Sequence, residues 1–292
     1  MTLNTGNWHK YMAMPAFLLF FLFFLFPLLK GMQLSVMEWD GFSTPHFVGL
    51  QNFIDFFHDR RALGDVRTTL LFALGSAPLL NLTGLGLALF LNQTFRGRDG
   101  IRAAVYLPAV ISPMIMGSVW YLLLQPGRGL AYIFADKISF FQGFINGGNW
   151  MLSGGSALSV IILVNVWQFA GMTMVIYLAG LQSIPIELYE AASVEGSGVL
   201  STFRYVTLPQ LLPSIRINVI TNIIGSLSVF EVILALTDGG PGYATESLSI
   251  YILRMCYGSK TGYSTAVALV LFVIILIPVL ISFRFFQHLE DK

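Results

Sequence analysis

Cysteine is nearly absent and charge is scarce in this chain of 292 residues. The single cysteine, Cys256, excludes a disulfide framework within the chain and a metal cluster built on cysteines. Charged residues make up 11% of the sequence, against about 25% in a soluble globular domain. The net charge is +1, so the charge balance gives no reason to expect a nucleic-acid partner. So few charges indicate that lipid surrounds much of the protein.

Catalytic and metal-binding patterns are also missing. The histidines His9, His46, His58 and His288 lie outside the long apolar runs, and none is paired at metal-ligand spacing. The sequence has no HExxH, no GxSxG and no Cys-His pair. The GSKT at 258–261 lacks the glycine before lysine that a phosphate-binding loop requires. We therefore expect no catalytic residue, no metal site and no cofactor held by this chain.

Long apolar runs are abundant. Hydrophobic residues make up 55% of the chain, and the mean hydropathy is +0.74. About 20 apolar residues cross the hydrocarbon core of a bilayer, and the runs of that length are 12–34, 68–92, 104–124, 157–181, 209–236 and 263–286. None alternates polar with apolar residues, which argues against a barrel, so each run is predicted to be a helix. The sequence predicts an all-α integral membrane protein with one transmembrane domain, 12–286.

The first run could also be read as a signal peptide, because His9 and Lys10 precede it. No small-x-small cleavage site follows Lys30, which favours an uncleaved span. Six spans place both termini on one side. Lysines and arginines are equally numerous on the two sides, but three arginines crowd the short turn 95–103 on the side of the termini. That clustering favours a cytoplasmic position for both termini.

The loop 35–66 is then external and contains a short amphipathic pattern. Apolar residues recur at helical spacing on one face, and the residues are Leu50, Phe53, Ile54 and Phe57. This face is predicted to lie on the membrane or, preferably, to pack against the end of the bundle. The later external segment LTDGGPGYATES, 236–247, is predicted to be a turned loop because of its glycines and proline.

Uncharged polar side chains form two stripes within the spans. The fourth span carries Asn165, Gln168 and Met172 on one helical face, and the fifth carries Asn218, Asn222 and Ser226. One interpretation is hydrogen bonding between neighbouring helices, at about 0.6 kcal/mol per bond. The other is a passage for a sugar, since amides and hydroxyls beside aromatic rings suit its hydroxyls and apolar faces. The spacing alone supports both interpretations equally.

One acid stands inside a span. Glu231 lies near the external end of the fifth span, where a hydrated side chain is the simpler interpretation. An ion-coupled carrier usually keeps a charged group deep in the bundle, so this alternative stays open without support.

The segment 182–208 breaks the apolar pattern. A proline and Glu187 begin a helix in which alanines form a small-residue face, and Gly196 and Gly198 are predicted to end it. A second helical stretch, VLSTFRYVTL, leads to Pro209. A short helix with a small-residue face on a rigid base suits a groove on another protein.

Within this segment, EAASVEG is followed by nine residues and then VTLP. This resembles the EAA signature of the membrane subunits of binding-protein-dependent ABC importers. The matching residues are Glu190, Ala191, Ala192, Gly196, Leu208 and Pro209, while Val206 replaces Ile and Glu195 stands where Asp is common. The blocks FVGLQNF, LFLNQTFRGRDGIRAAVYLPAVISPMI, LAGLQSIPIELYEAASVEG and LTDGGPGYATESL resemble carbohydrate-uptake permeases of the MalF or UgpA kind.

The resemblance implies an ABC importer permease fold of type I (MetI-like) in a bacterial or archaeal cytoplasmic membrane. It implies a second EAA-bearing permease, two ATPase subunits that bind ATP and Mg, and an external solute-binding protein. The loop 182–208 would be cytoplasmic and would couple to the ATPase through Glu190, Ala191, Ala192, Glu195, Gly196, Leu208 and Pro209. The loop 236–247 and the helix near residues 50–57 would face the binding protein.

The resemblance also implies that a sugar or oligosaccharide passes the stripes. By the resemblance the residues concerned are Gln168, Phe169, Met172, Asn222, Ser226 and Val229, and Asn218 joins them because it lies on the same stripe. Glycerol 3-phosphate or a polyol is the alternative solute, although a phosphate ester would need a cation near the cavity. Spans four and five offer only Arg216, near the cytoplasmic end. A purely structural membrane subunit and an ion-coupled carrier are the alternatives from other classes.

Overall fold

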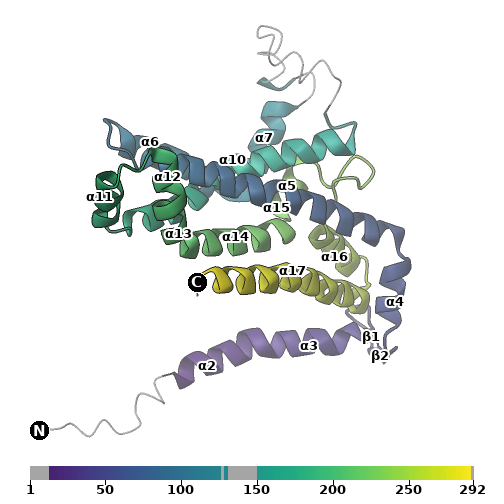
Figure 1. Ribbon diagram of the computed structural model, residues 1–292. Coiled ribbons are helices and arrows are strands. Elements are labelled where there is room, and N and C mark those ends of the chain that lie inside the picture. The colour runs from purple at the N-terminus through teal and green to yellow at the C-terminus, as the bar shows by residue number, and fades with distance from the viewer. Residues whose placement is uncertain (1–12, 126–127, 131–149, 291–292) are drawn as a thin grey trace, which may run out of the picture. The chain divides into compact units, whose positions relative to one another are not determined.

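The computed structural model describes residues 13–125, 128–130 and 150–290. The described part is almost entirely helical (Figure 1). It forms two compact units: unit 1 comprises Met1–Arg60 and Ile252–Phe272, and unit 2 comprises Arg61–Tyr251 and Val273–Lys292. The expected all-α fold is confirmed.

Four helical segments are long and apolar enough to cross a membrane. The first, Met14–Ser35, is continuous through α2 (Met14–Phe20), the π-helical turn η1 (Phe21–Leu25) and α3 (Phe26–Ser35). The others are α5 (Arg60–Leu91), α10 (Gly154–Gln182) and α17 (Thr261–Glu290). Their places agree with four of the expected spans.

A fifth candidate span is bent. The helices α6 (Arg98–Val110) and α7 (Pro113–Leu124) pass the same test only together, and they meet at 98°. Ser112 precedes Pro113, which disfavours the helical conformation for Ser112, and its ψ is 133°. The run 104–124, expected as one straight helix, is therefore divided at Ile111 and Ser112.

The expected span 209–236 is divided as well. It consists of α13 (Leu208–Gln210), α14 (Leu212–Leu227) and α15 (Glu231–Leu236). Phe230 at the break between α14 and α15 has φ −143° and ψ −66°, outside the helical region. Among the described residues the structure supplies four spans, or five with the bent pair, so the count of six stays a prediction.

Unit 1 contains the only strands among the described residues. The strands β1 (Met37–Glu38) and β2 (His46–Phe47) pair antiparallel, and Glu38 lies opposite His46. The helix α4 (Gln51–His58) follows. The side-chain amide of Asn52 donates to the carbonyl oxygens of Ser35 and Met37, at 2.8 and 2.9 Å. This pair of bonds ties α4 to the hairpin.

The buried face of α4 differs from the expected one. Asn52 and Phe56 are its buried side chains, whereas the face expected to pack against the bundle is largely exposed. Leu50 is 66%, Ile54 is 49% and Phe57 is 64% exposed. Periodicity finds the apolar stripe correctly, but the bonds of Asn52 turn the opposite side of the helix toward the hairpin.

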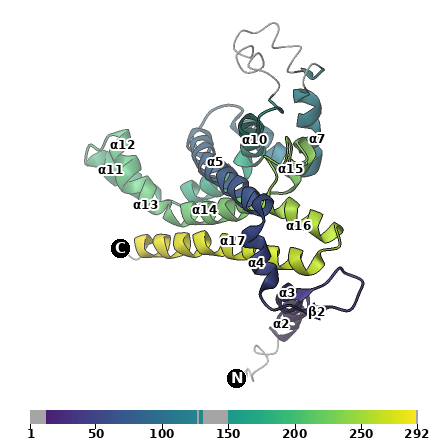
Figure 2. The ribbon, with the colours of Figure 1, turned by 90° about the vertical axis from the view of Figure 1, so that its right-hand side faces the viewer.

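In unit 2, the helix α10 contributes to two apolar cores. One core joins α5, α10, α15 and α16 (Leu248–Tyr257) around Phe72, Ile161 and Ile233. The other joins α5 and α10 to Leu211, the residue before α14, and it includes Leu91 and Tyr177. Figures 1 and 2 show the short elements α11 (Ile186–Val194), α12 (Val199–Thr202) and α13 gathered at one end of α14. The π-helical turn η2 (Phe203–Thr207) links α12 to α13.

Candidate functional site

The segment 182–208 folds as a short helix with a closed end. α11 carries Glu187 in its first turn, as expected. Gly196 has φ +73°, and the N–H of Ser197 donates to the carbonyl of Ala192 at 2.9 Å. A second bond runs from the N–H of Gly196 to Ser193 at 3.0 Å. Together these bonds form a Schellman motif, which confirms that the helix ends at Gly196. Gly198 has an ordinary φ of −75°.

The base of this segment is fixed to unit 2. Ile184 near the start of the segment and Leu211 just beyond its end are buried in the same core as Leu181. The hydroxyls of Tyr189 on α11 and Thr207 on η2 lie 3.3 Å apart. Both ends of the segment are therefore anchored to unit 2.

The outer side of the segment is exposed and partly apolar. Of the residues that match the EAA signature, Ala192 is buried at 7% exposure and Leu208 is half-buried. The others, Glu190, Ala191, Glu195, Gly196 and Pro209, are exposed. Beside them, Val194, Val199 and Leu200 are 89%, 91% and 80% exposed. We call these three residues the apolar tip. Large apolar side chains left exposed in one short segment make it a candidate interaction site.

The motif did not point to the apolar tip. In the sequence, the apolar tip corresponds to the stretch SVEGSGVL, in which valine and leucine flank a glycine-hinged turn. A turn that leaves large apolar side chains on both of its sides has no core of its own to bury them.

The polar residues of α10 contact two different neighbours. The side-chain amide of Asn165 donates to the hydroxyl of Ser76 on α5 at 2.7 Å. The side-chain amide of Gln168 donates to the carbonyl of Ile111 at 3.0 Å, at the break between α6 and α7. Met172 on the same stripe is 53% exposed. Within this chain, therefore, the stripe does not line one continuous space.

The polar residues of α14 meet α10 at Thr173. The side-chain amide of Asn218 donates to the carbonyl of Thr173 at 3.3 Å. The side chain of Asn222 lies 3.4 Å from the hydroxyl of Thr173. Thr173 was not among the predicted site residues, because a lone threonine in an apolar span carries no signal. These contacts are bonds between helices, and a role of the same residues in a passage stays a prediction.

Three buried polar atoms on these helices have no hydrogen-bond partner among the described residues. They are Oε1 of Gln168, Oδ1 of Asn218 and Oγ of Ser226. Gln168 and Asn218 are 0% and Ser226 is 2% exposed. Phe169, the remaining predicted passage residue, is half-buried. A buried polar atom without a partner calls for an explanation, such as a group supplied by water or by another molecule.

The loop after α15 is held by an ion pair with α5. Arg61 donates to both carboxylate oxygens of Glu246, at 2.8 and 3.0 Å, and Glu246 is 0% exposed. The guanidinium of Arg61 lies 3.6 Å from the ring centroid of Tyr243. Tyr243 has φ +66° and is 49% exposed. The loop is turned rather than helical, as predicted, and the pair fixes its shape.

Among the residues that the structure describes, no group of three or more His, Cys, Asp or Glu side chains is placed to hold a metal ion. The predicted absence of a cofactor in this chain stays a prediction.

Comparison with known proteins identifies relatives over most of the chain. A probable ABC transporter permease of Pyrococcus horikoshii is 33% identical over 91% of both chains. The trehalose/maltose transport system permease MalF of Thermococcus litoralis is 32% identical over 79% of this chain and 76% of its own. The sn-glycerol-3-phosphate transport system permease UgpA of Yersinia enterocolitica is 31% identical over 97% and 95%.

A solved structure shares the fold. A chain of a bacterial ABC transporter involved in the import of the acidic polysaccharide alginate has a TM-score of 0.81 with 24% identity, over 97% of this chain and 96% of that one. The family of binding-protein-dependent transport system inner membrane components matches residues 81–292. The chain therefore belongs to this family, the membrane-embedded permeases of ABC transporters, as the EAA signature indicated.

Proposed function

We propose that this chain is one permease subunit of an ATP-driven importer that passes a sugar or oligosaccharide from an external binding protein into the cytoplasm. The observation that carries the proposal is α11, anchored at both ends of its segment, with its exposed apolar tip. A second EAA-bearing permease and two ATPase subunits would complete the complex, with ATP and Mg bound by the ATPases.

The geometry of the segment 182–208 supports a mechanical role. Since its two ends are buried in the core of unit 2, a force on the exposed face of α11 would reach α10 and α14. Movement of the ATPases would then move α11 as a lever and change the packing of the spans. The apolar tip and the exposed EAA residues are the surface that a cleft on the ATPase would cover.

The polar residues favour a sugar as the solute. The side chains on the facing parts of α10 and α14 are amides and hydroxyls, which exchange hydrogen bonds with sugar hydroxyls. Relatives named for sugars support the same class, among them the trehalose/maltose permease and a multiple sugar-binding transport permease of Streptococcus mutans.

Glycerol 3-phosphate is the second candidate, because UgpA is similar over nearly the whole chain. A phosphate ester needs a cation beside it. Arg216, the cation on α14, donates to the carboxylate of Glu290 on α17. Because Glu290 already neutralises this arginine, α14 offers no unpaired cation for a phosphate ester. This favours the neutral sugar over the anionic solute.

The proposal places the segment 182–208, the turn 95–103 and both termini in the cytoplasm of a bacterial or archaeal cell. A Gly97→Cys variant tests this arrangement, since Gly97 has open space around it. We expect labelling of Gly97→Cys only from the cytoplasmic side, in a background in which the exposed Cys256 is replaced by serine. Labelling from outside intact cells would reverse the topology.

The function is tested in proteoliposomes that contain both permeases, the ATPases and the binding protein. We expect uptake of a labelled sugar only when ATP is inside and the binding protein is outside. Uptake driven by a proton gradient without ATP would support an ion-coupled carrier instead, for which the exposed Glu231 at the start of α15 would be the first residue to replace. Uptake of glycerol 3-phosphate alone would replace the sugar by the second candidate.

A further inference from the structure

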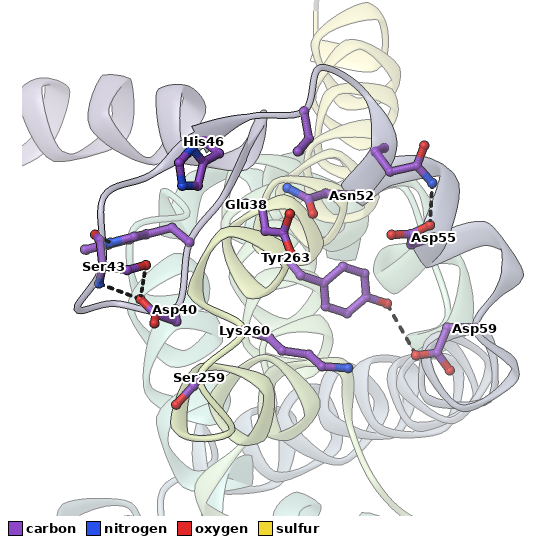
Figure 3. Close-up of a pocket in the computed structure, with 13 residues that line it drawn as sticks. Glu38, Asp40, Ser43, His46, Asn52, Asp55, Asp59, Ser259, Lys260 and Tyr263 are labelled. Atoms are coloured by element: carbon purple, nitrogen blue, oxygen red, sulfur yellow. Dashed lines mark hydrogen bonds between the residues drawn. The ribbon is translucent and has the colours of Figure 1, made fainter.

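Unit 1 contains a cavity of about 800 Å³. It lies between the hairpin β1–β2, the helix α4 and the start of α17 (Figure 3). Small-molecule sites have volumes of about 300–1,000 Å³, so this cavity can hold a ligand larger than one amino-acid side chain. None of its residues belongs to the segment 182–208 or to the polar stripes of α10 and α14.

The walls of the cavity are built by specific contacts. Asn52 fixes α4 to the hairpin through two backbone carbonyls. The N–H of Gly262 at the start of α17 donates to the carbonyl of Trp39 at 2.9 Å. A Cβ on Gly262 would lie 2.1 Å from the carbonyl oxygen of Met37, so only glycine allows this approach. The three elements are therefore held together before any ligand arrives.

Hydrogen-bond acceptors dominate the lining. It carries four carboxylates, from Glu38, Asp40, Asp55 and Asp59, against one lysine, Lys260, and one histidine, His46. The N–H groups of Ser43 and Phe42, together with the Ser43 hydroxyl, lower the pKa of Asp40 from 3.8 to about 2. Asp40 is therefore charged at every physiological pH.

Asn52 adds a fixed acceptor. Its side chain is 7% exposed and lines the cavity, and its Nδ2 is committed to the two carbonyls. Its Oδ1 is left as a hydrogen-bond acceptor on the cavity wall, because both bonds to the hairpin come from Nδ2.

Two aromatic residues complete the lining. Trp39 and Tyr263 both line the cavity. The hydroxyl of Tyr263 donates to Oδ2 of Asp59 at 3.4 Å, which orients the ring (Figure 3). Carboxylates and an amide oxygen accept hydrogen bonds from hydroxyls, and aromatic rings pack against the apolar faces of a sugar ring.

We propose that this cavity is a saccharide-binding site in unit 1, separate from the passage, that takes an uncharged sugar unit and rejects uronates and phosphate esters. The choice of a sugar rests on the proposed function. The choice of an uncharged one rests on the excess of carboxylates, which repel an anion. The site would face the outside of the cell, since loop 35–66 is expected to be external.

The test measures direct binding to the complete transporter in nanodiscs, without binding protein. Saturation-transfer NMR would be used with neutral trimers of glucose, mannose and galactose, and with a trimer of uronic acid. We expect one neutral trimer to bind and the uronate to bind at least about tenfold more weakly. The double variant Glu38→Gln and Asp55→Asn removes two charges at nearly constant shape, and we expect it to weaken neutral binding about tenfold. Glu231→Gln, outside the cavity, should bind as the parent does.

Three outcomes would overturn the inference. They are no binding by any neutral trimer, binding that the double variant leaves unchanged, and binding of arginine or spermidine in place of sugar. The inference and the proposed function fail separately. If no trimer binds to the cavity but ATP-driven sugar uptake persists with binding protein, only the cavity is misassigned. If a trimer binds but no ATP-driven sugar uptake occurs, the proposed function fails instead.

Discussion

The side-chain amide nitrogen of Gln168 lies 3.0 Å from the carbonyl oxygen of Ile111, where α6 and α7 meet at 98°. A helix that breaks inside a membrane leaves backbone carbonyls without their usual partners. Gln168 supplies a donor at that break, although its spacing in the sequence suggested only a stripe facing either a helix or a sugar.

Replacing Gln168 with Met removes this donor while keeping the length of the side chain. We expect the free energy of unfolding to fall by about 1–2 kcal/mol, because the carbonyl of Ile111 loses its partner. Unfolding of the purified complex by SDS measures the change. Met172→Leu, an exposed position one turn further along α10, is the control. Equal stability of the Gln168→Met variant and the parent would show that the bond does not hold the break.

Gly171 lets α10 approach α6 closely. A Cβ at Gly171 would lie 2.2 Å from the carbonyl oxygen of Val105 and 2.8 Å from the Cα of Tyr106, both backbone atoms. We expect Gly171→Ala to destabilise the protein by about 1–3 kcal/mol, since one helix has to move. A Cβ at Gly225 on α14 meets nothing within 4 Å. Gly225→Ala should therefore be neutral or stabilising by up to about 1 kcal/mol, and the same loss in both variants would contradict the packing described.

Gly196 occupies the surface proposed to meet the ATPase. A side chain there has open space but is strained at φ +73°, at a cost of about 1–2 kcal/mol that Asp tolerates better than most residues. Gly196→Asp should therefore fold but place a charge between α11 and its partner. We expect ATP-dependent uptake to fall at least tenfold. Gly97→Asp is the matched control, because Gly97 also has a positive φ, +88°, and open surroundings. Full uptake by the Gly196→Asp variant with the ATPase still copurifying would exclude this surface.

Asn222 separates the two interpretations of the polar stripes. Asn222→Leu removes one hydrogen bond to Thr173, so we expect assembly to persist. If Asn222 also meets the solute, the apparent affinity for sugar should change by about two- to tenfold. The measurement is uptake kinetics over a panel of sugars. Unchanged kinetics for every sugar would leave Asn222 a packing residue only.

The sequence predicted the helical class, the places of four straight spans and the end of α11 at Gly196. These features depend on local causes: long apolar runs, and a glycine at a left-handed position. It did not predict the 98° bend at Ser112. It also did not predict that Leu50, Ile54 and Phe57 on α4 are exposed. Both depend on distant partners. Gln168 lies some 57 positions from Ile111, and Asn52 lies 17 positions from Ser35.

The candidate sites show the same division. The EAA residues were found because their spacing is a local pattern. The ion pair of Arg61 with Glu246 joins positions 185 apart, and no local pattern in the sequence predicts it. The apolar tip was missed because exposed valines in a membrane protein resemble any other apolar residues until the fold shows that nothing covers them.

The central claim is that α11 docks on an ATPase subunit in the cytoplasm. A cysteine at Val194, 89% exposed on the apolar tip, tests it most directly in a background in which Cys256 is replaced by serine. Treatment of the assembled complex with a short bifunctional crosslinker should join Val194→Cys to the ATPase, whereas Ile54→Cys on α4 should not crosslink to it. Val194→Cys that forms no crosslink, or that reacts with an impermeant reagent outside intact cells, would contradict the account.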